Sequence, residues 1–197
     1  GAASNNRSVT YNYMDSTPER PVWTTSTLAR SSWSDSHVFG KPHGTEYDSD
    51  ATSDSTVGNT DGVSIYYEHE TGVNQIKAGA ASAISASIES GDFDISATQG
   101  GGADLRGDGE YMMKIRRVLP DFLQQTGDAR VTLNLKNYPT DSQASSSLGP
   151  FTTTTTTTKI DTRARARAIS LKVDNTSTGQ HWKLGTFRLD IQADGRR

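Results

Sequence analysis

The chain has 197 residues, a net charge of −3 and a hydrophobic share of 32%, which is low for a globular domain. It contains no cysteine, so disulfides and thiolate metal sites are excluded. No run of about 18 apolar residues is present to cross a membrane. The low apolar share indicates either long loops or a stability that depends on neighbouring subunits.

The charge is unevenly distributed along the chain. Residues 1–110 hold 16 acidic and 6 basic residues, a balance of −10, whereas residues 111–197 hold 7 acidic and 14 basic residues, a balance of +7. Such a division fits either contact of the basic half with nucleic acid or the meeting of opposite charges on two copies. The negative total argues against a stand-alone DNA-binding protein.

The spacing of polar and apolar residues predicts an all-β protein. Ser, Thr, Gly, Asn and Asp separate short alternating runs, a pattern typical of antiparallel sheets in propeller- or sandwich-like modules with long loops. We expect residues 1–62 to be a loop-rich N-terminal segment of a longer protein. Residues 63–197 are predicted to form an antiparallel β domain that ends in a C-terminal hairpin. The first predicted strands cover residues 63–69, 83–89, 93–95, 110–118 and 131–138.

Three stretches carry mixed signals. Residues 79–88 are rich in Ala, which favours a helix, but Ile84, Ala86 and Ile88 alternate, and we expect a strand. Residues 120–125 predict a short helical turn, because Pro and Asp suit a first turn and Gly127 suits its end. Seven consecutive Thr residues, 152–158, predict an extended edge strand or one between subunits, with low-complexity disorder as the alternative.

The last two predicted strands cover residues 163–173 and 183–193. Each has a one-sided apolar face, and the turn-forming residues 174–181 connect them. We therefore expect an antiparallel hairpin whose apolar face packs on another sheet. That face contains Ile169, Leu171 and Val173 of the first strand and Phe187, Leu189 and Ile191 of the second.

Arginines are the main candidates for an interaction site. In a strand Arg163, Arg165 and Arg167 point to one side and the intervening alanines to the other. Such a row of guanidinium groups can bind the carboxylates or phosphates of a partner, or it can be a solvated face with local ion pairs. We expect local pairs or subunit contacts rather than direct contact with DNA. Arg116 and Arg117 are further candidates for a subunit contact or a DNA channel.

No pattern in the sequence indicates an enzyme, a cofactor or a metal. The four histidines, His37, His43, His69 and His181, lack metal-ligand spacing. The acidic residues 48–54 lack the Gly and Glu of a calcium loop. The glycine-rich residues 98–109 lack the motif of a phosphate-binding loop. A carboxylate pair for glycoside cleavage stays possible, so a cell-wall hydrolase remains a third hypothesis.

A series of short motifs resembles the tail nozzle proteins of short-tailed bacteriophages, also called tail tubular protein B or packaged-DNA stabilisation proteins. No single motif is specific, and the resemblance rests on their order across residues 60–197. They include Glu68-His-Glu-Thr-Gly72, Ser90-Gly-Asp-Phe93, Leu119-Pro-Asp-Phe122, Tyr138-Pro139 and Gly149-Pro-Phe151. The closing motifs are Arg163-Ala-Arg-Ala-Arg167, Trp182-Lys-Leu-Gly185, Arg188-Leu-Asp-Ile191 and Asp194-Gly-Arg-Arg197.

The resemblance implies a structural protein of the virion rather than an enzyme. Members assemble as a hexameric ring beside the adaptor and portal, extend the DNA channel, retain the packaged genome and take part in its ejection. The implied partners are further copies, other tail proteins, double-stranded DNA passing without sequence specificity and, at infection, the host surface. The alternative is a receptor- or glycan-binding tail module that uses the aromatic residues Trp23, Trp33, Tyr66 and Tyr67, which we expect to be exposed.

Overall fold

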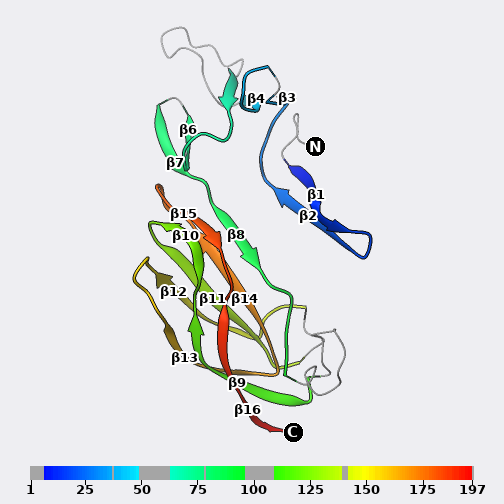
Figure 1. The fold of residues 1–197 in the computed structure, drawn as a ribbon, viewed down its shortest axis with the longest axis vertical. Coiled ribbons are helices and arrows are strands. Elements are labelled where there is room, and N and C mark those ends of the chain that lie inside the picture. Colours follow the sequence, from blue (N-terminus) through cyan, green and yellow to red (C-terminus); the bar gives the residue numbers. More distant parts are fainter. Residues whose placement is uncertain are drawn as a thin grey trace. The chain divides into compact units, whose positions relative to one another are not determined.

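The computed structural model describes residues 7–36, 38–48, 63–77, 79–95, 109–138 and 142–196. In these ranges the chain forms β-strands and no helix, and the strands pair antiparallel, so the predicted all-β fold is confirmed (Figure 1). No helix in the described ranges could therefore cross a membrane. The chain divides into two compact units, Gly1–Gly72 and Val73–Arg197.

The first unit contains a two-stranded and a three-stranded sheet. Its strands are β1 (Ser8–Thr17), β2 (Arg20–Ser26), β3 (Ser32–Ser34), β4 (His43–Asp48) and β5 (Val63–Glu68). β1 pairs with β2, and β4 lies between β3 and β5. The division between the units falls ten residues after the expected boundary at 62/63, because β5 pairs with β4. Four strands also lie within the segment expected to be rich in loops.

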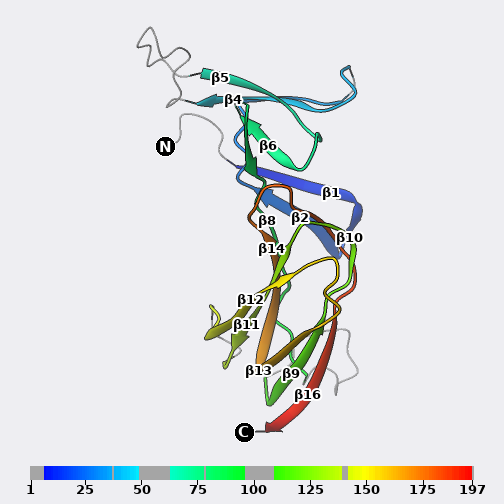
Figure 2. The same cartoon turned by 90° about the vertical axis from the view of Figure 1, so that its left-hand side faces the viewer.

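The second unit contains two larger sheets and two short strand pairs. The four-stranded sheet has the order β12-β11-β14-β8 and the three-stranded sheet the order β13-β9-β16, while β10 pairs with β15 and β6 with β7. Figure 2 shows β11, β12 and β14 on one side of this unit and β9 and β16 on the other. The strands are β6 (Asn74–Lys77), β7 (Ala80–Ala83), β8 (Ala86–Glu89), β9 (Tyr111–Leu119), β10 (Phe122–Thr126), β11 (Ala129–Lys136), β12 (Ser146–Thr153), β13 (Ile160–Ala166), β14 (Ala168–Asn175), β15 (His181–Leu184) and β16 (Arg188–Arg196).

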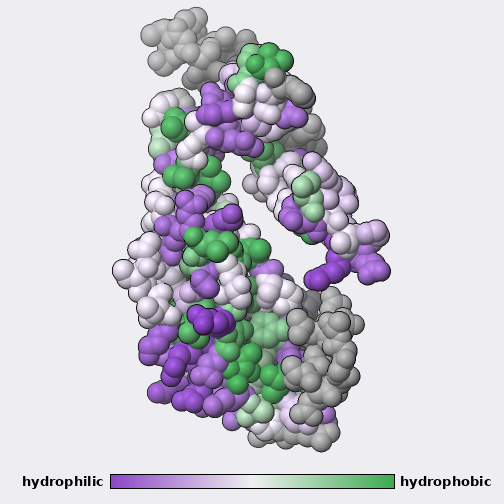
Figure 3. Space-filling view, in the orientation of Figure 1, coloured by the Kyte–Doolittle hydropathy of each residue, from purple (hydrophilic) through white to green (hydrophobic). Residues whose placement is uncertain are grey.

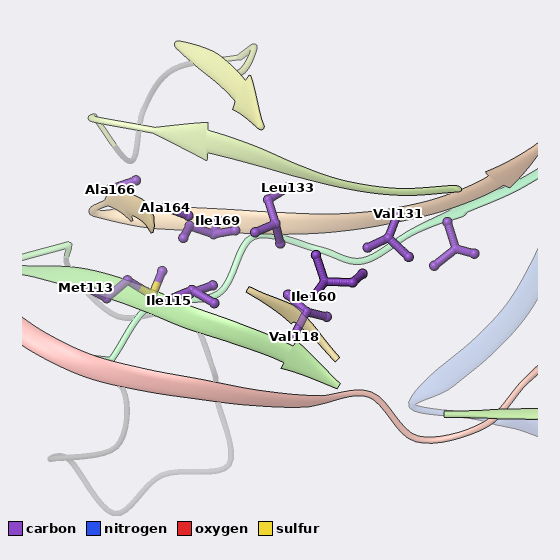
Figure 4. Packing of buried hydrophobic residues seen from close by; sticks show 10 residues of the cluster. Met113, Ile115, Val118, Val131, Leu133, Ile160, Ala164, Ala166 and Ile169 are labelled. Carbon is purple, nitrogen blue, oxygen red and sulfur yellow. The ribbon is translucent and has the colours of Figure 1, made fainter. Parts of the chain in front are cut away.

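The core of the second unit lies between the two larger sheets, as in a β-sandwich. Inward side chains of β9 and β13 meet those of β11 and β14 (Figure 4). The alternation predicted for β11 is confirmed, since Val131 and Leu133 are fully buried and Leu135 packs against the cluster. The fully buried members are Met113, Ile115, Val118, Val131, Leu133, Ala166 and Ile169.

The predicted C-terminal hairpin is wrong, although its apolar residues do pack against the core. Residues 163–173 do not form one strand: the chain leaves the three-stranded sheet after Ala166 and enters the four-stranded sheet at Ala168. Residues 183–193 are likewise divided between β15 and β16. β14 pairs with β11 and β8, while β15 and β16 pair with β10 and β9.

One other local prediction is wrong, and another is confirmed only in part, since the edge strand β12 includes Thr152 and Thr153 but not the rest of the threonine run. Residues 120–125 form no helical turn, because β10 begins at Phe122 and pairs with β15. The threonine run is extended only to Thr153 and then turns. The turn is held by Thr hydroxyl groups, since Thr157 Oγ1 accepts a hydrogen bond of 2.9 Å from the Thr154 amide. Such local bonds compete with an extended ladder.

The remaining strand predictions have mixed outcomes. Residues 79–88 are extended as expected, but the strand is interrupted between Ala83 and Ala86. Residues 93–95 contribute only an isolated bridge between Phe93 and Ile169. The acidic residues 48–54 and the glycine-rich residues 98–109 lie mostly outside the described residues.

Candidate functional site

The outer face of the three-stranded sheet is rich in positive charge. Residues that alternate with the buried ones point away from the core, which places six cations and three carboxylates on this surface. The net charge of the surface is therefore +3. We call it the basic face, and it consists of Lys114, Arg116 and Arg117 of β9, Asp161, Arg163 and Arg165 of β13, and Arg188, Asp190 and Asp194 of β16.

A β-bulge in the central strand brings two consecutive arginines to this face. In β9, Ile115 and Val118 are both fully buried, and Arg116 and Arg117 between them are both exposed. Toward β16, Asp190 is opposite Arg117 and Ile191 is opposite Ile115, so Arg116 has no counterpart. The extra residue breaks the alternation of the strand. Without it, one of the two guanidinium groups would point into the core.

Two ion pairs within the chain neutralise part of the basic face. Arg117 and Asp161, opposite each other on β9 and β13, form an ion pair of 3.3 Å. The pKa of the Asp161 carboxyl is lowered mainly by a hydrogen bond from Lys159, and the loss of hydration opposes this effect. The charges of Lys159 and Arg117 add to the lowering. Arg165 of β13 binds Asp194 of β16 across the central strand.

The other cations of the basic face have no such partner in the described ranges. The side chains of Lys114, Arg116, Arg163 and Arg188 make no hydrogen bond or ion pair with residues that the structure describes. In the view of Figure 3, hydrophilic residues gather over the part of the second unit where Figure 1 places β13 and β9. Within the described part of the chain, most of this positive charge is therefore left open to a partner.

Arg167 does not belong to this surface, which corrects the predicted row of three arginines. It lies between β13 and β14, is partly buried, and its guanidinium donates to the carbonyl oxygens of Gly109 at 2.6 Å and Glu110 at 3.3 Å. Its backbone amide donates to the carbonyl of Lys136 at 3.0 Å. Arg167 thus links the connection between β13 and β14 to Gly109 and Glu110, the two residues before β9.

The small side chains of the alanines between the arginines are buried in the core. Ala164 and Ala166 are 1% and 0% exposed and lie between the sheets (Figure 4). Their backbone pairs with that of Ile115 and Met113 in β9. The alternating sequence of β13 therefore gives the strand one core face and one charged face, as predicted.

The aromatic residues of the first unit are less available than expected. Trp23, Trp33 and Tyr66 are exposed, but Tyr67 is 8% exposed and lies under the guanidinium of Arg30 at 4.1 Å. Tyr66 stacks on His43, and its hydroxyl lies 2.5 Å from that ring. The prediction of four exposed aromatics is therefore wrong for Tyr67.

His69 belongs to a polar cluster beside these aromatic residues. Arg30 donates from Nε to the Nε2 atom of His69 at 3.0 Å and forms a 3.2 Å ion pair with Glu46. The His69 ring also contacts Trp33, with centroids 4.6 Å apart. Burial, followed by the charges of Arg30 and His43, lowers the pKa of His69, and Glu70 opposes this effect.

No local pattern of residues indicates this Arg30–His69 cluster, because its members come from distant segments. The side chains of Arg30 and His69 lie close to the backbone of Gly44, which has no side chain to exclude them. A Cβ atom on Gly44 would lie 2.8 Å from Arg30 Cδ and 3.2 Å from His69 Nε2. Within the described ranges, no group of three or more His, Asp or Glu side chains is placed to hold a metal ion. Residues 49–54 of the acidic run lie outside those ranges.

The arrangement of the basic face is suited to binding a surface with several negative charges. Neighbouring strands are about 5 Å apart, so the cations of β9 and β13 repel one another unless anions lie between them. Guanidinium groups bind carboxylates and phosphates through paired hydrogen bonds. No protein-family model matches the chain, and no curated protein matches its sequence.

Proposed function

We propose that the protein is a structural component of a phage tail, a subunit of the nozzle or tail tube that extends the DNA channel and retains the packaged genome until ejection. The observation that carries the proposal is the basic face, whose open cations call for an anionic partner surface. The ordered motifs of residues 60–197, which resemble tail nozzle proteins, supply the kind of assembly. The antiparallel β architecture is compatible with it.

The proposed mechanism is mechanical and electrostatic. A wall that only guides a duplex should bind phosphate weakly, because several arginine–phosphate contacts would hold the sliding DNA in place. We therefore assign Arg116 and Arg163 to a contact between protein surfaces rather than to the lining of the channel. Arg165 and Arg117 keep their partners within the chain and support that surface.

Negative-stain electron microscopy of the purified protein tests the proposed function. We expect closed rings with an axial opening, or attachment of the protein to a larger tail particle. The hexameric count is part of the proposal and is read from class averages. Monomers at every concentration and salt condition would contradict the assignment.

A receptor- or glycan-binding tail module is the second candidate, and one observation favours it. Tyr11 and Trp23 form an exposed aromatic pair on the β1–β2 hairpin, with centroids 4.6 Å apart. Such a surface can stack on sugar rings. Binding of host polysaccharide by a monomer, lost in Trp23→Ala and retained in Arg163→Ala, would favour this candidate over the tail wall.

A further inference from the structure

The two units of the chain carry opposite net charge. Residues 1–72 contain 10 acidic and 4 basic residues, a net charge of −6, and residues 73–197 contain 13 acidic and 16 basic residues, a net charge of +3. Glu19 and Glu70 of the first unit are exposed and make no hydrogen bond or ion pair with described residues. The first unit and the basic face are therefore electrostatically complementary.

We propose that the basic face binds the acidic first unit of a second copy of this chain. The inference rests on the proposed assembly and names the two surfaces that build it. Because these surfaces differ, each copy offers its basic face to one neighbour and its first unit to the other. Repetition of such a head-to-tail contact closes a ring when the rotation between copies allows it.

The charges on the chain favour a second copy over a nucleic acid as the partner. A duplex is repelled by the total charge of −3 on the chain, whereas a neighbouring copy presents the −6 charge of its first unit to the basic face as an attraction. The chain already pairs this face with carboxylates, since Arg117 and Arg165 bind Asp161 and Asp194. Arg116 and Arg163 are placed to bind further carboxylates in the same way.

Charge reversal on each surface tests the pairing. The variant Arg116→Glu/Arg163→Glu makes the basic face acidic, and the variant Glu19→Lys/Glu70→Lys makes the first unit more basic. Each variant alone sets side chains of like charge against one another at the substituted positions, so we expect mass photometry to show that the concentration for half-assembly rises by about thirtyfold. All four positions are exposed strand or turn positions, and circular dichroism checks that both variants stay folded.

An equimolar mixture of the two variants is the decisive test of the pairing between the two surfaces. At the four substituted positions, every contact between unlike variants then pairs a positive with a negative side chain, so assembly should return to within about threefold of the wild type in rings that alternate the two chains. The control is Lys183→Glu, an exposed cation of β15 outside the basic face, which should assemble like the wild type. High salt should weaken the wild-type assembly.

Three results would overturn the inference. The first is a wild-type protein that assembles while Arg116→Glu/Arg163→Glu assembles equally well, which leaves the proposed function standing. The second is a mixture that stays dissociated. The third is a variant that keeps its assembly but loses binding to duplex DNA, which would assign the basic face to nucleic acid. A wild type that never assembles would end the proposed function as well.

Discussion

Arg163 and Arg167 show how residues of one type, four positions apart, take different roles. Arg163 is exposed and open to a partner, whereas Arg167 is partly buried and donates to two carbonyl oxygens of the chain before β9. A hydrogen bond from a charged donor contributes more to stability than a neutral one. Arg167 is therefore a structural residue, and the candidates for interaction are narrowed to Arg116, Arg163 and their neighbours on the basic face.

Replacing Arg167 by Ala should destabilise the second unit. The substitution leaves the Gly109 and Glu110 carbonyls without this charged donor, and we expect the free energy of unfolding to fall by about 2 kcal/mol. Arg163→Ala is the matched control and should leave the unfolding midpoint nearly unchanged, because the side chain has no partner among the described residues. Urea unfolding measures both variants at a protein concentration below that of assembly, where the contact between copies does not contribute. Equal midpoints for the two would contradict the assignment.

His69 should make the first unit sensitive to mild acid. Its pKa is lowered in the folded state by burial and by Arg30, and Arg30 Nε needs a neutral ring nitrogen as acceptor. As the pH falls below about 6.5, the unfolded chain takes up a proton that the folded state resists, so stability decreases. The decrease ends once the pH is below the lowered pKa.

Thermal unfolding between pH 7.5 and 5 measures this dependence. We expect the His69→Gln variant to lose the part of the pH dependence that begins near 6.5, while the variant of exposed His181, His181→Gln, should keep it. A His69 ring that titrates at or above 6.5 in an NMR experiment would rule the explanation out.

At the scale of elements, breaks in the alternation of apolar and polar residues indicate where the strands end, bulge or change sheets. Apolar residues pass from even to odd positions at Ala168–Ile169, where the chain changes sheets, and again between Leu184 and Phe187, where β15 ends and β16 begins. They pass from odd to even between Ile115 and Val118, at the bulge. Each change of phase marks a break or bulge in a strand.

These changes of phase explain which predictions succeeded. The existence of the strands and the core face of β11 follow from alternation alone, and so does the division of β13 into alanine and arginine sides. Strand pairing does not, because β14 and β16 find their partners far away in the sequence. The helical turn expected at 120–125 failed because pairing with β15 outweighs the local preference of Pro120 and Asp121.

The candidate surface was predictable in part. The exposure of Arg116, Arg117, Arg163 and Arg165 follows from their spacing among apolar residues. Their gathering on one face depends on the pairing of β9 with β13, which joins segments almost fifty residues apart. The role of Arg167 and the cluster around His69 depend on contacts between distant segments, and no local pattern in the sequence indicates them.

Gly185 lies between β15 and β16, beside the backbone of Asp121, which lies between β9 and β10. Its amide donates to the Asp121 carbonyl at 2.9 Å, and a Cβ atom at this position would lie 2.6 Å from that oxygen. Gly185→Ala should therefore force the two backbones apart and cost about 2 kcal/mol of stability. Gly91→Ala is the control, since its Cβ would meet nothing within 4 Å. Chemical unfolding that gave equal midpoints for both would contradict the close approach.

At the scale of the whole molecule, the distribution of charge is the main feature. A negative first unit and a positive sheet face in the second unit are the basis of our proposal that copies of the chain associate. The low apolar share of the chain agrees with this view, because such a chain gains stability when its neighbours bind it. The proposed tail role and the proposed head-to-tail contact both follow from this distribution together with the resemblance of the ordered motifs.

A high-resolution electron-microscopy map of the assembled protein tests the central claim most directly. We predict a closed ring in which the outer face of β13, β9 and β16 is covered by the first unit of the adjacent copy, with Arg116 and Arg163 against carboxylates. A ring in which that face lines the axial channel, or is bare toward solvent, would contradict the account.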